Sequence, residues 1–445
     1  MHLLKSLKQS NSDIRILWSS VFFRMASYGL TNQVLTLYLR SINISEQNIG
    51  IFMTLTLVGD TIISYFLTWN ADKIGRRVVM VIGTIMMFLS GIVFASFSNF
   101  YVLLFAAIVG VISPSGDETG PFKSVEEASI AHLTPHNHRP EIFAFHGLFA
   151  TAGAALGSLI CGVLVDYMNH YLKYELETCY RYMFIIYSGF SLIKLVLMMF
   201  LSNKCEIYVV NFIEESESDA TEDSPLLTNE NNHHQDEEIN TKSFLSATSR
   251  YYLPRLLVIF MLDSFGYGFM PSAWVVYYLK ITFKLTASAM GFLFFLTNSV
   301  NAISSVPSAF FAKLLGPVKA MLITQVPSAF FFGAVPFCSH YMPVAVLLLF
   351  YYTTTSMDVV PRQVLLTSIM PREEITKVMG IVNIGKTFAR CIGPVFTGKL
   401  ATHGMLYVGF FINSGCVILA DILLASNFLH LDQEILSKQA IEHDI

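Results

Sequence analysis

The chain has 445 residues, of which 53% are hydrophobic and only 13% are charged. Because an average soluble domain carries about 25% charged residues, this composition excludes an ordinary soluble protein and indicates a membrane protein. The net charge of −4 comes from one acidic segment, since ten of the 32 acidic residues lie between 214 and 238 and the rest of the chain is mildly basic.

Apolar runs of roughly 20 residues, long enough to cross about 30 Å of hydrocarbon as helices, recur along the chain. A membrane barrel would instead show strands of about ten residues with alternating polarity. The sequence therefore predicts an all-α membrane protein with 12 transmembrane helices in two six-helix halves related by a pseudo-twofold axis. The predicted spans are 14–38, 49–69, 78–98, 101–133, 142–165, 182–201, 254–279, 288–312, 318–338, 342–369, 378–401 and 405–426.

The first residues are polar and basic, and the first apolar run is long enough to be a span itself. We therefore expect no cleavable signal peptide and a cytosolic amino end. An even number of spans returns the carboxyl end to the same side, and most of the 28 lysines and arginines fall on that side. This bias predicts that both termini are cytosolic.

Four segments follow from this division. Residues 1–201 form the N-terminal six-helix half, and residues 250–430 form the C-terminal six-helix half. Between them, residues 202–249 are acidic and have almost no aliphatic periodicity, so they predict a disordered cytosolic linker. Residues 431–445 are expected to be a cytosolic tail.

The linker contains one apolar pair within its polar run, in the sequence EDSPLL. Glu222 followed by Leu226 and Leu227 resembles the acidic dileucine signal that clathrin adaptors bind. This resemblance implies a vacuolar or lysosomal membrane ahead of the plasma membrane. A chance match in an acidic linker remains the open alternative.

The two halves repeat one another at two similar offsets. FFRMASYGLTNQ aligns without a gap with MLDSFGYGFMPS at an offset of 239, which places Arg24 opposite Asp263. A second region repeats at an offset of 236. Two similar offsets in separate regions indicate duplication of a six-helix unit. The matched residues are Tyr28 with Tyr267, Gly29 with Gly268, Thr151 with Thr387, Gly157 with Gly393, and Gly162 with Gly398.

The turn between the second and third predicted spans reads NADKIGRRVV, with Asp72, Gly75, Arg76 and Arg77. It resembles the loop signature of the major facilitator superfamily, and with the two-halved layout the resemblance covers nearly the whole chain. We expect an uncharacterised, fungal-type branch of that superfamily. The chain lacks the arginine motif of many proton-driven drug exporters and the Pro-Glu-Ser-Pro-Arg run of sugar transporters.

The resemblance implies a cavity between the halves, lined chiefly by the first, fourth, seventh and tenth spans. Arg24 and Asp263 would then face this cavity from equivalent positions, and charges in a membrane usually face such a path. We expect this pair to mark the substrate or ion site, with Tyr28 and Tyr267 beside it. A structural salt bridge that locks the halves together is the alternative.

The predicted fourth span carries further acids among glycines and prolines, which can break a span and expose its backbone beside a cavity. Asp117 and Glu118 are candidates to bind a proton, a cation or an amine-bearing substrate. At the offset of 236, Glu126 falls opposite Arg362.

The tenth predicted span also carries Asp358. A charge pair of Glu126 and Arg362 across the pseudo-twofold axis would resemble a gate that closes one side; alternatively, Glu126 lies at the cytosolic surface. Lys386 and Arg390, four residues apart, share one face of the eleventh span and either hold an anion or cap Asp358.

These observations predict a secondary active transporter of a small polar or charged solute, coupled to protons through Asp117, Glu118 or Asp263. No nucleotide-binding loop occurs, and the six cysteines have no metal-like spacing. We expect a monomer in the lipid bilayer, no enzyme activity, no cofactor, no metal site and no nucleic-acid partner. The alternative is a sensor or scaffold that keeps the fold without transporting and signals through its linker.

Overall fold

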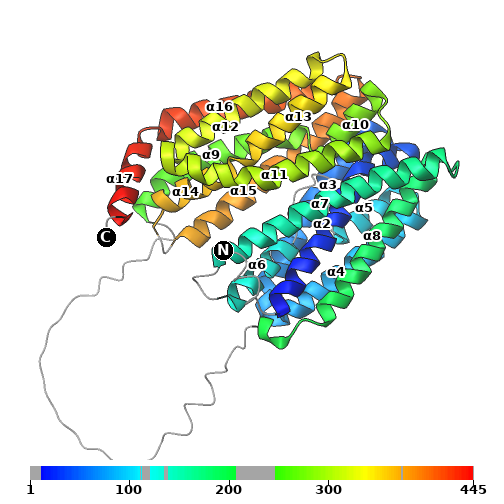
Figure 1. Ribbon diagram of the computed structural model, residues 1–445, viewed down its shortest axis with the longest axis horizontal. Helices are drawn as coiled ribbons and strands as arrows, with labels where there is room; N and C mark the ends of the chain where they lie inside the picture. Colours follow the sequence, from blue (N-terminus) through cyan, green and yellow to red (C-terminus); the bar gives the residue numbers. More distant parts are fainter. Residues whose placement is uncertain are drawn as a thin grey trace, which may run out of the picture.

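The computed structural model describes residues 12–110, 112, 121–134, 139–206, 246–371 and 374–443. All regular structure in these ranges is helical, which confirms the all-α prediction for the part of the chain that is described. Figure 1 shows two helical bundles side by side, the N-terminal one in blue to green and the C-terminal one in light green to red.

The N-terminal bundle begins with a long helix whose middle is buried on nearly every side, α2. Ser45 caps α3 by accepting a hydrogen bond from the amide of Asn48, and Asn99 caps α5 in the same way from Tyr101 and Val102. The elements are α2 (Ser12–Ser41), α3 (Glu46–Ile74), α4 (Arg76–Ser96), α5 (Phe100–Val109), α6 (Pro121–Leu133), α7 (Arg139–His170), α8 (Leu176–Met199) and the short 3₁₀ turn η2 (Asn203–Cys205).

The C-terminal bundle contains two long helices that are each interrupted once. Pro271 separates α9 from α10 because proline cannot donate a backbone hydrogen bond within a helix. The elements are α9 (Ala247–Phe269), α10 (Ser272–Phe283), α11 (Ala287–Leu315), α12 (Pro317–Ala334), the 3₁₀ turn η3 (Val335–Phe337), α13 (Tyr341–Ser356), α14 (Val359–Ile369), α15 (Ile375–Thr402), α16 (Val408–Phe428) and α17 (Leu431–His443).

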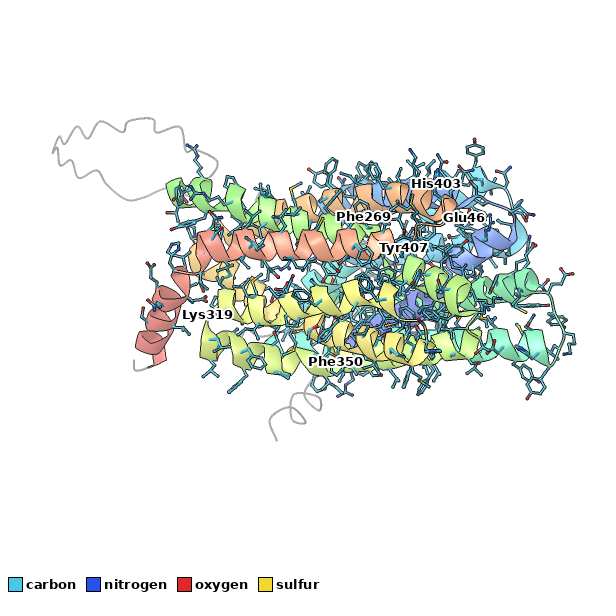
Figure 2. All side chains as sticks on the ribbon, turned by 90° about the horizontal axis from the view of Figure 1, so that it is seen from above. Glu46, Phe269, Lys319, Phe350, His403 and Tyr407 are labelled. Carbon is cyan, nitrogen blue, oxygen red and sulfur yellow. The ribbon has the colours of Figure 1, made fainter. Side chains whose placement is uncertain are left out.

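Eight stretches of the described residues are long and apolar enough to cross a membrane. Large apolar side chains point outward from them; Phe350, on the outer surface in Figure 2, is 52% exposed. Such a surface suits lipid, not water. Helices α2, α11 and α15 and the α5–α6 pair are outside these eight, so the count of 12 spans stays a prediction. The eight are Glu46–Leu67, Arg76–Ser96, Ile142–His170, Leu176–Met199, Thr248–Phe283, Pro317–Phe337, Tyr341–Ile369 and Val408–Phe428.

Glycines at the repeated positions lie where helices cross within each bundle. A Cβ atom at Gly157 would lie 2.0 Å from the carbonyl oxygen of Ala26, where α7 crosses α2. Its repeat partner Gly393 lies on α15, and a Cβ there would be 2.1 Å from the carbonyl carbon of Gly268 on α9. The glycine identities therefore have a physical reason, because only glycine lets these backbones touch.

The two bundles also meet through glycines. A Cβ at Gly162 on α7 would lie 3.0 Å from the Cα of Gly291 on α11, and one at Gly50 on α3 would lie 2.9 Å from the Cα of Gly398 on α15. The two contacts are related by the repeat, since Gly162 and Gly398 are repeat partners. Both lie at the end away from α17, and the bundles diverge toward α17 and α6 (Figure 1).

A carboxylate closes the turn between paired helices at the α17 end of each bundle. Gly75 and Gly316 have φ angles of 104° and 88°, which strain other L residues. At the start of α4, the amides of Arg76 and Arg77 donate hydrogen bonds to the carboxylate of Glu206. At the start of α12, the amides of Val318 and Lys319 donate to the carboxylate of Asp432 in the same way. Figure 2 labels Lys319 beside α17.

Candidate functional site

Two adjoining cavities of about 380 and 660 Å³ lie between the bundles. The smaller is lined by α9, α10, α11, α13, α14 and α15 of the C-terminal bundle. The larger is lined by α2, α6 and α7 of the N-terminal bundle and by α10, α11, α13 and α14 of the C-terminal bundle. They share the lining residues Ser272, Asn301, Tyr352, Val359 and Gln363. We call them together the central cavity, whose combined size suits a small solute.

A cluster of buried charges lies inside the N-terminal bundle, with one member from each of four helices. Glu126 of α6 is at its centre: its Oε2 accepts from Arg24 of α2 at 2.5 Å, and its Oε1 lies 3.3 Å from Nζ of Lys194 on α8. The side chains of all three are fully buried. Nε2 of His146 on α7 lies 3.7 Å from Glu126 and completes the N-terminal cluster. Of these four residues, His146 lines the central cavity.

A second cluster lies in the C-terminal bundle and reaches the cavity directly. The guanidinium of Arg362 on α14 donates to Asp263 of α9 at 2.9 Å and to Asp358, one turn away. It also lies over the ring of Phe260, 4.8 Å from the centroid. Asp263, Asp358 and Arg362 all line the central cavity. We call these three residues the C-terminal cluster.

The two clusters correspond in position but carry opposite charges. Arg24 and Glu126 of the N-terminal cluster align by the repeat with Asp263 and Arg362 of the C-terminal cluster. Each pair closes within its own bundle, so Arg24 does not form the alternative salt bridge with Asp263, and the expected pair of Glu126 with Arg362 is wrong. The expectation that Arg24 faces the cavity also needs correction, because Arg24 is fully buried and is not among the residues that line it, whereas Asp263 is. Glu126 is also buried and not at a surface. The physical reason is that a buried charge is costly unless it is paired, and each bundle carries an opposite charge within reach of its own.

Two further cations line the cavity from α15. Lys386 and Arg390 stand one turn apart on the same face, and Asn383 stands one turn before Lys386. All three line the wall that also carries the C-terminal cluster.

The structure places the other predicted residues as follows. Tyr28 and Tyr267 line the central cavity from opposite bundles. Arg76 donates to the carbonyl oxygen of Ala128 and Arg77 to that of Met199, so both loop arginines bind within their own bundle. The predicted residues outside the described part are Asp117, Glu118, Glu222, Leu226, Leu227 and the side chain of Asp72.

Sequence reasoning missed four residues of these networks. Lys194 could have been found because it is a cation within a predicted span. The buried Asp421 of α16 could have been found because it is an acid within one. Glu206 and Asp432 each follow the last long helix of a bundle, so a search for acids at matched places after the sixth and twelfth predicted spans could have found them.

Comparison with known proteins decides the family. Residues 17–222 and 256–442 match the family model described as Major Facilitator Superfamily. An uncharacterised membrane protein of Saccharomyces cerevisiae is 48% identical over 446 residues, which cover 98% of each chain. The protein belongs to the major facilitator superfamily.

More distant similarities agree with this membership. The quinolone resistance protein NorA of Staphylococcus aureus strain Mu50 is 26% identical over 156 residues, 35% of this chain and 39% of that protein. The crystal structure of a D-xylose–proton symporter superposes with a TM-score of 0.68 at 17% identity, covering 92% of this chain and 95% of the other. The superfamily fold is thereby confirmed, and this member is an integral multi-pass membrane protein and a transporter, not an enzyme.

Proposed function

We propose that the protein moves a small polar or charged solute across its membrane by alternating access to the central cavity, and that it couples this movement to protons. The observation that carries the proposal is the cavity between two bundles, with a buried charge cluster of opposite polarity on each side. Charges so deep in a membrane protein usually mark a substrate or ion path.

The contacts between the bundles support alternating access. On the side away from α17, glycine backbones touch, and Asp166 of α7 accepts hydrogen bonds from the amides of Ala287 and Ser288 at the start of α11. Toward α17 the cavity reaches residues near helix ends, such as Phe143 and Met379. With cytosolic termini, as the basic residues predict, the cavity is open to the cytosol in this conformation.

Asp263 is the described carboxylate that suits proton coupling best. It lines the cavity, bonds to Arg362 through one oxygen, and its other oxygen, Oδ1, has no hydrogen-bond partner among the described residues. Protonation of Asp263 would release Arg362 to Asp358 alone and change the charge that the solute meets. Arg24, Tyr28 and Tyr267 would support this site from the cavity wall or behind it, while Asp117 and Glu118 remain sequence-based candidates.

We also propose that the protein works as a monomer in the vacuolar or lysosomal membrane, with both termini in the cytosol. Glu222, Leu226 and Leu227 would bring it there through a clathrin adaptor. Changing both leucines to alanine should redirect a fluorescently tagged protein to another membrane. An unchanged distribution would remove the sorting role.

The transport proposal is tested in vesicles that contain the purified protein and a pH-sensitive dye. Pools of amino acids, polyamines, organic anions and sugars are added outside, and wild-type protein should move protons with one pool. The variant Asp263→Asn should lose this proton movement, while Lys399→Gln, an exposed site on α15, should keep it.

Normal gradient-driven uptake by Asp263→Asn would overturn the role of Asp263. If neither protons nor any labelled solute moves through the wild-type protein, the transport proposal fails. A sensor or scaffold that acts through residues 211 to 240 would then be the better account.

A further inference from the structure

The lysines and arginines that line the central cavity all belong to the C-terminal bundle. In the N-terminal cluster, Arg24, Glu126 and Lys194 are fully buried behind the cavity wall. That wall presents Tyr28, Asn32 and neutral neighbours, with Glu127 and His146 as its titratable groups. The N-terminal wall therefore contributes one acid, Glu127, and no lysine or arginine, so the cations that could bind an anionic solute belong to the opposite wall.

On that opposite wall the charges are unequal. Three cations, Arg362, Lys386 and Arg390, line the smaller cavity with two acids, Asp263 and Asp358. Arg362 bonds to both acids, so its charge and theirs are already engaged with one another. The other two cations of this wall, Lys386 and Arg390, belong to α15.

Lys386 is the less compensated of these two cations. No ion pair of Lys386 occurs within the described ranges at 4.0 Å or less, whereas Asp263 and Asp358 are each paired with Arg362. At about 1.5 Å per residue, Lys386 stands about 16 Å from the first residue of α15, well inside a helix of 28 residues that the sequence predicts to span the membrane. A cation there is costly unless water or an anion compensates it.

The neighbours of Lys386 form a surface suited to an anionic group. Arg390, one turn further, offers a planar fork of donors that matches carboxylate and phosphate oxygens, and Asn383 adds an amide. All three line the same cavity of about 380 Å³. Across it, Tyr267, Asn301 and Gln363 supply neutral hydrogen-bonding groups for the rest of a small molecule.

We infer that the solute is a small organic anion, a carboxylate or a phosphate ester, whose charged group binds Lys386 and Arg390. This inference rests on the proposed transport function and names the substrate class for the same cavity. In the competing arrangement Lys386 merely offsets Asp263 and Asp358, and the solute is neutral or cationic. Removing the lysine charge should weaken binding of the solute in the first arrangement and leave its uptake unchanged in the second.

The test uses the full-length protein, purified and reconstituted into vesicles. The probes are succinate and glutamate as carboxylates, glycerol 3-phosphate as a phosphate ester, and choline, spermidine and xylose as solutes of other charge. Their binding is measured by thermal stabilisation and their uptake by radiolabel. The variants are Lys386→Gln, Arg390→Gln and, as a matched control, Lys399→Gln on the exposed face of the same helix.

We expect at least one anion to stabilise and cross with wild-type and Lys399→Gln protein. We expect Lys386→Gln and Arg390→Gln each to weaken its binding by about tenfold or more, as loss of a charged hydrogen-bond donor does. The preference between succinate and glycerol 3-phosphate separates the two kinds of anion.

Other outcomes are equally informative. Uptake of choline, spermidine or xylose without any anion, unchanged in Lys386→Gln, would overturn the inference and leave the transport proposal standing. Anion uptake that Lys386→Gln and Arg390→Gln do not weaken would also overturn it. Failure of every probe to bind or cross with wild-type protein would count against transport itself.

Discussion

The guanidinium of Arg24 donates to the carboxylate of Glu126 across 2.5 Å, and both side chains are fully buried. At the repeated positions of the other bundle, Asp263 and Arg362 form the same kind of pair with the charges exchanged. Exchanging both charges preserves each pair, so each bundle keeps a pair at the repeated positions, but only the C-terminal pair lines the cavity.

The N-terminal cluster makes a prediction about stability. Glu126→Gln removes the anion that faces both Arg24 and Lys194, whereas Arg24→Gln leaves Glu126 beside Lys194. Since loss of one partner from a buried ion pair costs about 3–5 kcal/mol, both variants should unfold at lower temperature, and Glu126→Gln at the lowest. Thermal unfolding in detergent measures this, with Lys399→Gln as control. The reverse order would show that Arg24 is compensated elsewhere.

The glycine contacts between the bundles predict a conformational effect. Leucine at Gly162 or Gly398 cannot fit against the facing backbone, so either variant should force the bundles apart at the end away from α17. Spin labels at Ser41 and Thr286, on opposite bundles at that end, should move apart in pulsed electron resonance measurements. Leucine at Gly189, whose Cβ would have no described atom within 4 Å, is the control. Equal label distances in all three variants would contradict this role.

Removing the carboxylate of Asp166 should also separate the bundles at the end away from α17, but less than leucine at the glycine contacts does. This carboxylate accepts from the amides of Ala287 at 3.0 Å and Ser288 at 2.8 Å, and so caps α11 from the other bundle. Loss of a helix cap costs about 1 kcal/mol, which changes a two-state ratio about fivefold. Asp166→Ala should therefore increase the population with separated labels. A population equal to wild type would mean that the cap does not favour the closed end.

Asp421 offers a contrast to Asp263. It is buried in α16, and its Oδ2 has no hydrogen-bond partner within the described residues. A buried carboxylate without its own cation is costly, so an amide of the same shape should be tolerated. Asp421→Asn should keep proton-coupled uptake and at least wild-type thermal stability. Loss of proton movement in this variant would assign Asp421 to the proton path.

The positions of the helices could be predicted from the sequence better than the pairing of the charged side chains that they carry. Long apolar runs determine which segments become helices, and the repeat located Arg24, Asp263, Glu126 and Arg362 at matched positions. Pairing depends on how each helix is rotated about its axis, and one residue turns a helix face by about 100°. Nothing in the apolar pattern gave that rotation, because lipid-facing and buried residues are both apolar. Lys194 was missed as a partner for the same reason.

The carboxylate caps at Glu206 and Asp432 have a consequence for how the chain is held together. Each joins the residues just after one bundle's last long helix to the start of a helix earlier in that same bundle, α4 or α12. Each bundle is thus stabilised by a carboxylate near its own carboxyl end, and neither of these caps uses a residue of the segment 207–245. If the chain is produced as two fragments divided within that segment, each fragment should keep its own carboxylate cap. The fragments should then associate through the glycine contacts between the bundles and form a transporter of two chains.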